Sequence, residues 1–181
     1  MRGHLKAAYE KSKIDEDCMN IQVETYAGKN GDQIVDLILG IQNKEFEIPI
    51  TINDQPDLLS IESFYQKGAG NFWVARDGNK VVGTIALIDI GQGLGALRKM
   101  FVAKEYRGRE KGVAQLLLDV LLSWARENGM REIYLGTIDI LYAARRFYLK
   151  NGFEEIPKSG LPSSFPIMAV DTKFYRIQIL S

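Results

Sequence analysis

The sequence predicts an α/β (α+β) domain, a mixed and mostly antiparallel sheet of about six to seven strands flanked by about four helices. Short runs rich in β-branched and aromatic residues recur along the chain, and longer stretches between them carry apolar residues at helical spacing. No repeat and no low-complexity linker divides residues 21–181, which are therefore expected to form a single domain. Residues 1–20 carry little pattern and are interpreted as an N-terminal extension, an upstream or mobile arm.

The domain opens with one strand and two helices. Residues 21–26 alternate apolar and polar side chains, which is typical of a strand. Asp32 is a suitable N-cap for the next helix, whose apolar residues recur at helical spacing, namely Ile34, Val35, Leu37, Ile38 and Ile41. After a loop with two prolines, residues 57–65 predict a weaker helix that places on one side Leu58, Ile61 and Phe64.

Three strands are expected next. Residues 71–76 and 80–89 flank the sequence Asp77-Gly78-Asn79, whose glycine can adopt a positive φ, and the pattern predicts a hairpin. Residues 96–102 predict a third strand, with Leu97, and Phe101 as a second candidate, on one side and basic residues on part of the other.

The second half alternates helices and strands. The clearest helix begins at Val113, ends at Asn128-Gly129 and carries an apolar stripe of Val113, Leu116, Leu117, Val120, Leu121 and Trp124. Strands over residues 132–137 and 153–156 bracket a helix over 140–150, and a last strand spans 172–180. The predicted order is therefore β-α-α-β-β-β-α-β-α-β-β.

The composition excludes several kinds of chemistry. Lys and Arg together number 23, as do Asp and Glu, so no net charge favours a nucleic-acid partner. The single cysteine, Cys18, cannot form an internal disulfide and is typical of a reducing cytoplasm. The single histidine, His4, makes a Ser-His-Asp triad or a histidine metal site unexpected. No apolar run approaches the roughly 20 residues that span a bilayer, so we expect a cytoplasmic protein without metal or membrane.

Positive charge is nevertheless concentrated between a strand and the strongest helix. Residues 98–111 contain Arg98, Lys99, Lys104, Arg107, Arg109 and Lys111. A loop of small residues followed by a helix N-terminus presents backbone N–H groups and a positive dipole end, which suits a phosphate or pyrophosphate. The order Lys111-Gly112-Val113 does not fit a Walker loop, and the glycine spacing does not fit a Rossmann fingerprint.

Three segments resemble motifs of the GNAT superfamily, the Gcn5-related N-acetyltransferases. Arg109-Glu110-Lys111-Gly112-Val113-Ala114 resembles the family signature Gln/Arg-x-x-Gly-x-Gly/Ala, which binds acetyl-CoA. Tyr106-Arg107-Gly108 resembles the usual Tyr-Arg-Gly before it, and residues 98–102 resemble the fourth strand. Residues 144–153 resemble the second motif, in which a helix carries Tyr and ends before Gly-Phe. The resemblance covers residues 21–180 and implies the GNAT acyl-CoA N-acyltransferase fold.

The resemblance implies that an acetyl group passes directly from acetyl-CoA to a primary amine in a ternary complex. The pantetheine arm and acetyl oxygen are expected at the backbone of Met100, Phe101 and Val102, where the fourth strand splays from the fifth. Pyrophosphate is expected at the N–H groups of Arg109, Glu110, Lys111, Gly112, Val113 and Ala114, with side-chain charge from Arg107 and Lys111. Tyr148 is expected to protonate the departing thiolate, although a core aromatic is the alternative.

Two features of the site stay open at this level. The family often has Asn where this chain has Leu141, which puts a side-chain hydrogen bond to CoA in doubt. The fourth strand offers no carboxylate, so the general base is Asp89, Asp139 or an ordered water.

The resemblance does not identify the acceptor amine. It is compatible with a homodimer but does not require one. The resemblance implies that acceptor choice depends on the first two helices, on the loop over residues 44–57 and on the final hairpin. Residues 161–170 could cover the acceptor site. A silent acyl-CoA-binding sensor or interaction module is the alternative to an enzyme, because the fourth strand lacks a carboxylate. A nucleic-acid module ranks third, since the basic cluster lacks interleaved aromatic residues.

Overall fold

The computed structural model describes residues 20–179. The predicted N-terminal extension lies outside this range except for its last position, and so do Cys18 and His4. The α-helices of the described part are α2 (Gly31–Leu39), α3 (Ile61–Tyr65), α4 (Val113–Glu127) and α5 (Tyr142–Lys150). Its strands are β1 (Ile21–Thr25), β2 (Asn71–Asp77), β3 (Lys80–Asp89), β4 (Leu94–Val102), β5 (Glu132–Thr137), β6 (Glu154–Ile156) and β7 (Lys173–Gln178). The predicted order of helices and strands is confirmed.

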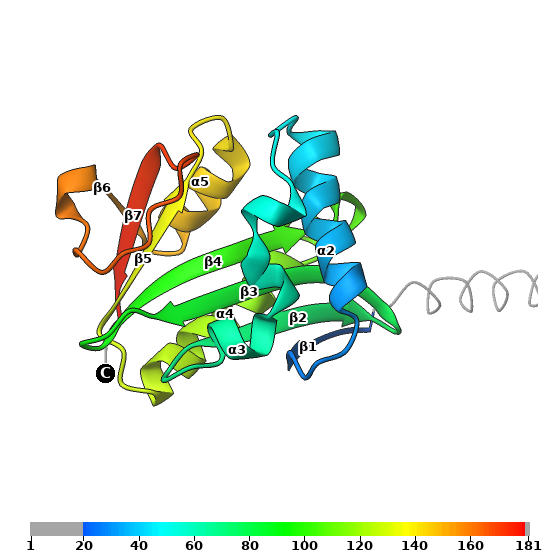
Figure 1. The fold of residues 1–181 in the computed structure, drawn as a ribbon, viewed down its shortest axis with the longest axis horizontal. Helices are drawn as coiled ribbons and strands as arrows, with labels where there is room; N and C mark the ends of the chain where they lie inside the picture. Colours follow the sequence, from blue (N-terminus) through cyan, green and yellow to red (C-terminus); the bar gives the residue numbers. More distant parts are fainter. Residues whose placement is uncertain (1–19, 180–181) are drawn as a thin grey trace, which may run out of the picture.

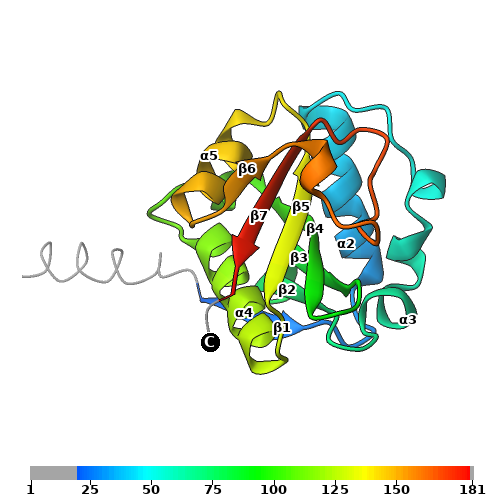
Figure 2. The ribbon, with the colours of Figure 1, turned by 90° about the vertical axis from the view of Figure 1, so that its left-hand side faces the viewer.

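The strands form one sheet in the order β1-β2-β3-β4-β5-β7-β6. Strands β4 and β5 run parallel, and the other neighbouring pairs of the described part are antiparallel. The prediction of a mixed, mostly antiparallel sheet is therefore confirmed. Helices α4 and α5 cover one face of the sheet, and α2 and α3 cover the other (Figures 1 and 2).

The two parallel strands separate along their length. Their pairing runs from Leu94 opposite Glu132 to Ala96 opposite Tyr134 and goes no further. Strand β4 continues to pair with β3 as far as Val102, whereas β5 continues along β7. The sheet therefore opens into a wedge between the second half of β4 and the end of β5.

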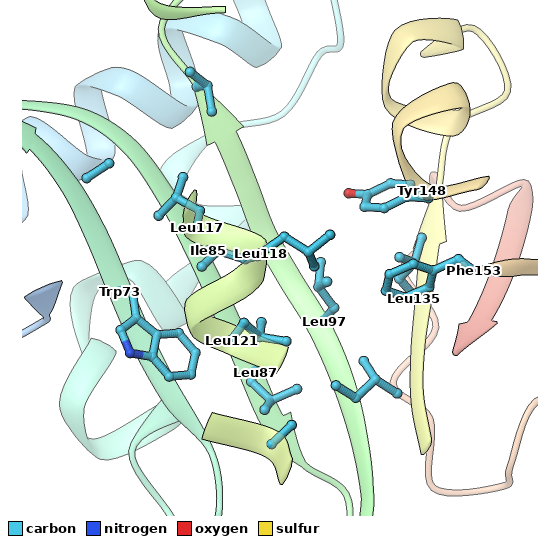
Figure 3. Packing of buried hydrophobic residues seen from close by; sticks show 14 of the residues in the cluster. Trp73, Ile85, Leu87, Leu97, Leu117, Leu118, Leu121, Leu135, Tyr148 and Phe153 are labelled. Carbon is cyan, nitrogen blue, oxygen red and sulfur yellow. The ribbon is translucent and has the colours of Figure 1, made fainter. Parts of the chain in front are cut away.

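Two apolar clusters hold the helices against the sheet. The cluster on the α4 face runs from β2 across to α5 and includes Trp73, Ile85, Leu117, Leu121, Leu135 and Phe153 (Figure 3). The cluster on the opposite face includes Ile34, Ile38, Ile61, Tyr65 and Phe72. Because the first cluster extends beneath both β4 and β5, packing keeps these strands in place where their backbone pairing has ended.

Four local predictions are wrong. Leu97 and Phe101 pack against opposite faces of the sheet, because β4 has an extra residue between them relative to β3. Asn30, not Asp32, is the N-cap of α2; its φ is 62° and its side chain makes no capping hydrogen bond. Phe64 is 45% exposed, because residues 57–65 divide into a 3-10 turn and the short helix α3, which buries Tyr65 instead. Leu116 is 43% exposed, because α4 turns Leu118 toward the sheet in its place.

Helix α2 continues directly into a π-helix, Gly40–Glu45, which periodicity had not distinguished from an ordinary helical turn. Glu45, at the end of this extension, forms an ion pair with Arg107 in the segment between β4 and α4. Within residues 20–179, no helix has both the length and the apolar character needed to cross a membrane.

Candidate active site

A cleft lies where β4 and β5 separate. One wall is formed by β4, with Arg98, Met100 and Phe101, and the other by the end of β5 and by α5, with Gly136 and Tyr148. The chain around Ile48 and Gln55 closes one side, and the connection between β6 and β7 closes another with Met168, Val170 and Asp171. The cleft thus collects side chains from five separate parts of the sequence.

A β-bulge shapes the β4 wall. Thr84 lies opposite Phe101 and Ala86 opposite Arg98, so β4 contains one residue more than β3 in this stretch. Lys99 sits at the bulge with φ of 52°, and its carbonyl accepts a hydrogen bond from Thr84 Oγ1 at 2.7 Å. The bulge bends β4 away from β5 and brings Met100 and Phe101 to the wall of the cleft.

Lys99 is buried by a polar network rather than exposed with the other basic residues. Its Nζ lies 3.2 Å from Asp57 Oδ2 and donates to Gln55 Oε1 at 2.5 Å. The Tyr65 hydroxyl donates to the same Asp57 oxygen at 2.5 Å, and Gln55 is joined to Gln42. Burial lowers the pKa of Lys99, which the attraction of Asp57 opposes. The network holds the loop before α3 against the bulge.

Tyr148 reaches the cleft from α5. Its ring packs between Phe147 and Phe153, with ring centroids 5.9 and 5.5 Å away. Its hydroxyl is directed toward β4 (Figure 3), where it lies 3.6 Å from Met100 Sδ. Burial raises the pKa of the Tyr148 phenol, which therefore keeps its proton at neutral pH. The structure thus places the Tyr148 ring in the core and its hydroxyl at the cleft, an arrangement that is compatible with the expected role as proton donor.

The loop between β4 and α4 ends at a glycine that has open space on the side where a side chain would project. Gly112 is the N-cap of α4 with φ of 67°, and a Cβ at this position would meet no other atom within 4 Å. Val113 is fully buried and Ala114 partly buried, so their side chains pack inward while the first helical N–H groups point out of the helix end. This is the geometry in which a helix N-terminus binds an anion.

Arg107 has a partner inside the protein. Its guanidinium pairs with Glu45 at the end of the π-helix, and its Nε donates to the Val102 carbonyl at 2.7 Å. The side chain therefore ties the loop to the extension of α2. Glu110 is close to the other glycine of the loop, since a Cβ at Gly108 would lie 2.6 Å from Glu110 Oε1.

The predicted site residues divide into two groups. Met100, Phe101 and Tyr148 meet in the cleft. Residues 109–114 lie in the loop and first turn of α4, and Val102 is buried at the end of β4. Leu141 also lines the cleft, where it brings an apolar side chain in place of an amide.

The two carboxylates considered as general bases lie elsewhere. Asp89 is at the closed end of the wedge, where its oxygens accept hydrogen bonds from the backbone N–H groups of Ala69 and Gly91. Asp139 forms an ion pair with Arg145, and its side chain is 55% exposed. Neither is among the residues that line the cleft.

Asp171 was missed by the sequence analysis. It precedes β7 in a connection without periodicity, and no motif surrounds it. The polar pair Gln42 and Gln55 was missed as well. The one signal for these residues is their position in segments expected to contact the acceptor or next to them.

Residues 36–153 match the model of the acetyltransferase (GNAT) family. A crystal structure of an acetyltransferase of the GNAT family from Staphylococcus aureus Mu50 is similar to this chain, with a TM-score of 0.84. The two sequences are 41% identical, and the match covers 88% of this chain and 99% of that one.

Two curated relatives are each similar to part of the chain. N-acetyltransferase 8F1 from Rattus norvegicus is 29% identical over 121 residues, 64% of this chain and 54% of that protein. N-acetylaspartate synthetase from Xenopus tropicalis is 37% identical over 102 residues, 55% of this chain and 37% of that protein. The chain therefore matches about half, or less, of the length of these relatives.

Proposed function

The chain belongs to the acetyltransferase (GNAT) family, and on this basis we propose that it transfers an acetyl group from acetyl-CoA to a primary amine. The observation that carries the proposal is the wedge between β4 and β5, which has the Tyr148 hydroxyl inside it and the start of α4 beyond its open end. The acceptor is an amine of a small molecule or a protein amino group. The single cysteine of the sequence favours the cytoplasm as the location.

Acetyl-CoA would occupy two places in this arrangement. The pyrophosphate would accept hydrogen bonds from the N–H groups of residues 109–114, supported by the positive end of the α4 dipole. The pantetheine arm would enter the wedge beside the backbone of Met100, Phe101 and Val102. The open space above Gly112 supports this placement, because a bulky anion can approach the backbone there.

The reaction would then proceed without a covalent enzyme intermediate. The amine attacks the thioester carbon, and the carbonyl oxygen gains negative charge that N–H groups of β4 stabilise. When the carbon–sulfur bond breaks, Tyr148 donates its proton to the sulfur, and the phenol later regains a proton from solvent. Catalysis would depend mainly on holding the amine and the thioester in the correct geometry.

Release of free CoA with a panel of amines tests the proposal. Because one relative is named N-acetylaspartate synthetase, L-aspartate is the first acceptor to assay, followed by other amino acids, polyamines, aminoglycosides and peptides. We expect CoA release that depends on one class of amine, with the acetylated product identified by mass spectrometry. Binding of acetyl-CoA without turnover on any amine would contradict the enzyme and support the alternative of a silent acyl-CoA sensor.

A further inference from the structure

The proposed reaction requires a group that removes a proton from the attacking amine, and we propose that Asp171 is this general base. This inference rests on the proposed function and identifies a catalytic residue for it. Among the described residues that line the cleft, Asp171 is the one carboxylate. It faces the same space as Tyr148, so the cleft contains a proton acceptor and a proton donor on different walls.

The position of the Asp171 carboxylate is fixed by its neighbours. Its Oδ2 accepts a hydrogen bond from the Met168 N–H at 3.0 Å, and its own N–H donates to the Met168 carbonyl at 3.0 Å. The same oxygen lies directly over Gly136 of β5, where a Cβ would be only 2.4 Å away. Glycine at this position of β5 therefore leaves the space that the carboxylate occupies. Among residues 20–179, this carboxylate accepts one hydrogen bond, and it does so through Oδ2.

The other carboxylates near the site are engaged elsewhere. Asp57 is buried against Lys99 and Tyr65. Asp89 accepts backbone hydrogen bonds at the closed end of the wedge, and Asp139 is paired with Arg145. Asp171 differs because Arg98, which also lines the cleft, influences it electrostatically, while Asp171 forms no ion pair within 4 Å in the described part of the chain.

Asp171 also has a route to solvent. It lines a second hollow at the surface, between the end of β6 and the start of β7, together with Lys158, Thr172 and Lys173. A proton taken from the amine on the cleft side can therefore leave toward this second hollow. The two proton transfers balance: Asp171 takes one from the amine nitrogen as the nitrogen–carbon bond forms, and Tyr148 gives one to the departing sulfur.

The electrostatic environment makes Asp171 a stronger base than a free carboxylate. Burial raises the pKa of Asp171, while the Met168 N–H and the charge of Arg98 act in the opposite direction. Charged or titratable groups face the carboxylate from β4 (Arg98 and Lys99), from α5 (Tyr148) and from the chain around the second hollow (Glu155, Lys158 and Lys173). A raised pKa brings the carboxylate closer to the range in which a base is most effective.

The test compares Asp171→Asn with the wild-type protein, using the amine that gives the highest rate in the panel. We expect kcat/KM to fall by about 100-fold or more, while the affinity for acetyl-CoA measured by calorimetry stays unchanged. The acidic limb of the kcat/KM profile against pH is expected to disappear. Asp119→Asn is the matched control, because Asp119 lies on the exposed side of α4 and accepts its hydrogen bond from Gln115 away from the cleft.

A folding measurement separates catalysis from structure. Because the pKa of Asp171 is raised in the folded protein, its contribution to stability is present at low pH and is lost as the pH rises through the folded pKa. Asp171→Asn is therefore expected to melt at or above the wild-type temperature at pH 7. Gly136→Ala, which pushes against the carboxylate without removing it, is expected to lower kcat as well.

The outcomes distinguish the two proposals. If the wild-type protein turns over no amine, both the proposed function and the assignment of Asp171 are overturned. If the wild type is active and Asp171→Asn keeps its rate and its acidic limb, only the assignment is overturned. The same holds if Asp139→Asn, rather than Asp171→Asn, removes the limb.

Discussion

Tyr148 has two structural roles at once. Its ring is part of the core on the α4 face, yet its hydroxyl reaches the cleft beside Met100. The two readings of this residue from the sequence, catalytic acid and core aromatic, were therefore not exclusive. A substitution that removes only the hydroxyl separates them, because the ring contacts with Phe147 and Phe153 remain.

Tyr148→Phe is expected to lower kcat by about 100-fold, because the departing thiolate loses its proton donor. Affinity for acetyl-CoA and thermal stability should remain close to wild type, since the phenyl ring still fills the same space. Steady-state kinetics and calorimetry measure the two effects. Tyr142→Phe is the control on the same helix, because Tyr142 is 63% exposed and lies outside the residues that line the cleft. An unchanged kcat for Tyr148→Phe would remove the acid role.

At the scale of single elements, the N-terminus of α4 is the helix end at which the pyrophosphate of acetyl-CoA is proposed to bind. Gly112 and Gly129 flank this helix at its two ends with almost the same backbone conformation, φ of 67° and 71°, and neither would bring a Cβ into contact within 4 Å. They differ in the sign of the helix dipole, which is positive at Gly112 and negative at Gly129. The chain thus contains its own matched pair for testing the anion site.

Gly112→Glu is expected to abolish detectable acetyl-CoA binding, because it places bulk and negative charge where the pyrophosphate would sit. Gly129→Glu adds the same charge and the same backbone strain, about 1–2 kcal/mol, at the opposite end of α4. It should leave the affinity for acetyl-CoA unchanged. Calorimetry on both variants decides the matter, and equal affinities would refute the assignment of the loop.

The bulge of β4 depends on a buried ion pair. Lys99 and Asp57 have side chains only 4% and 10% exposed. Lys99→Met is expected to destabilise the protein by about 3–5 kcal/mol, because it leaves the Asp57 charge buried without its partner. Urea denaturation measures this loss. Asp57→Asn in the same chain should restore much of the stability, since the amide is neutral and can still accept from Tyr65; additive losses would contradict the argument.

Helices and strands were predictable where neighbouring residues in the sequence carry the pattern. The hairpin of β2 and β3 was recognised from its turn, where Gly78 has φ of 56°, and α4 from its periodicity. The burial of Lys99 was not predictable, because a lysine in a strand is expected at the solvent, and the partners that bury this one lie some 40 residues earlier in the sequence. Asp171 was not predictable either, because an irregular connection has no period and its partner Gly136 becomes a neighbour only in the folded sheet.

At the scale of the whole molecule, the sheet consists of two parts joined at β4 and β5. Three residues on each strand are paired there, and further contacts come from the apolar cluster on the α4 face and from a smaller cluster that contains Ala96 and Tyr134. The proposed donor would cross this junction, with its acyl end in the wedge and its pyrophosphate at α4. Its binding energy would then be divided between two sites, each of which is formed by a different part of the sequence.

A shortened donor tests this division. Acetyl-pantetheine has the thioester and the arm that would enter the wedge, but it lacks the pyrophosphate. The wild-type protein is expected to use it with a much higher KM than acetyl-CoA and with a similar kcat, because the lost pyrophosphate contacts would bind the substrate and the transition state equally. Gly112→Glu should lower kcat/KM for acetyl-CoA to the value for acetyl-pantetheine, or below it, while its kcat/KM for acetyl-pantetheine stays at the wild-type level. If the substitution impaired both donors equally, the wedge and the helix N-terminus would not be separable sites, and the effect of Gly112→Glu would have to come from distortion of the cleft itself.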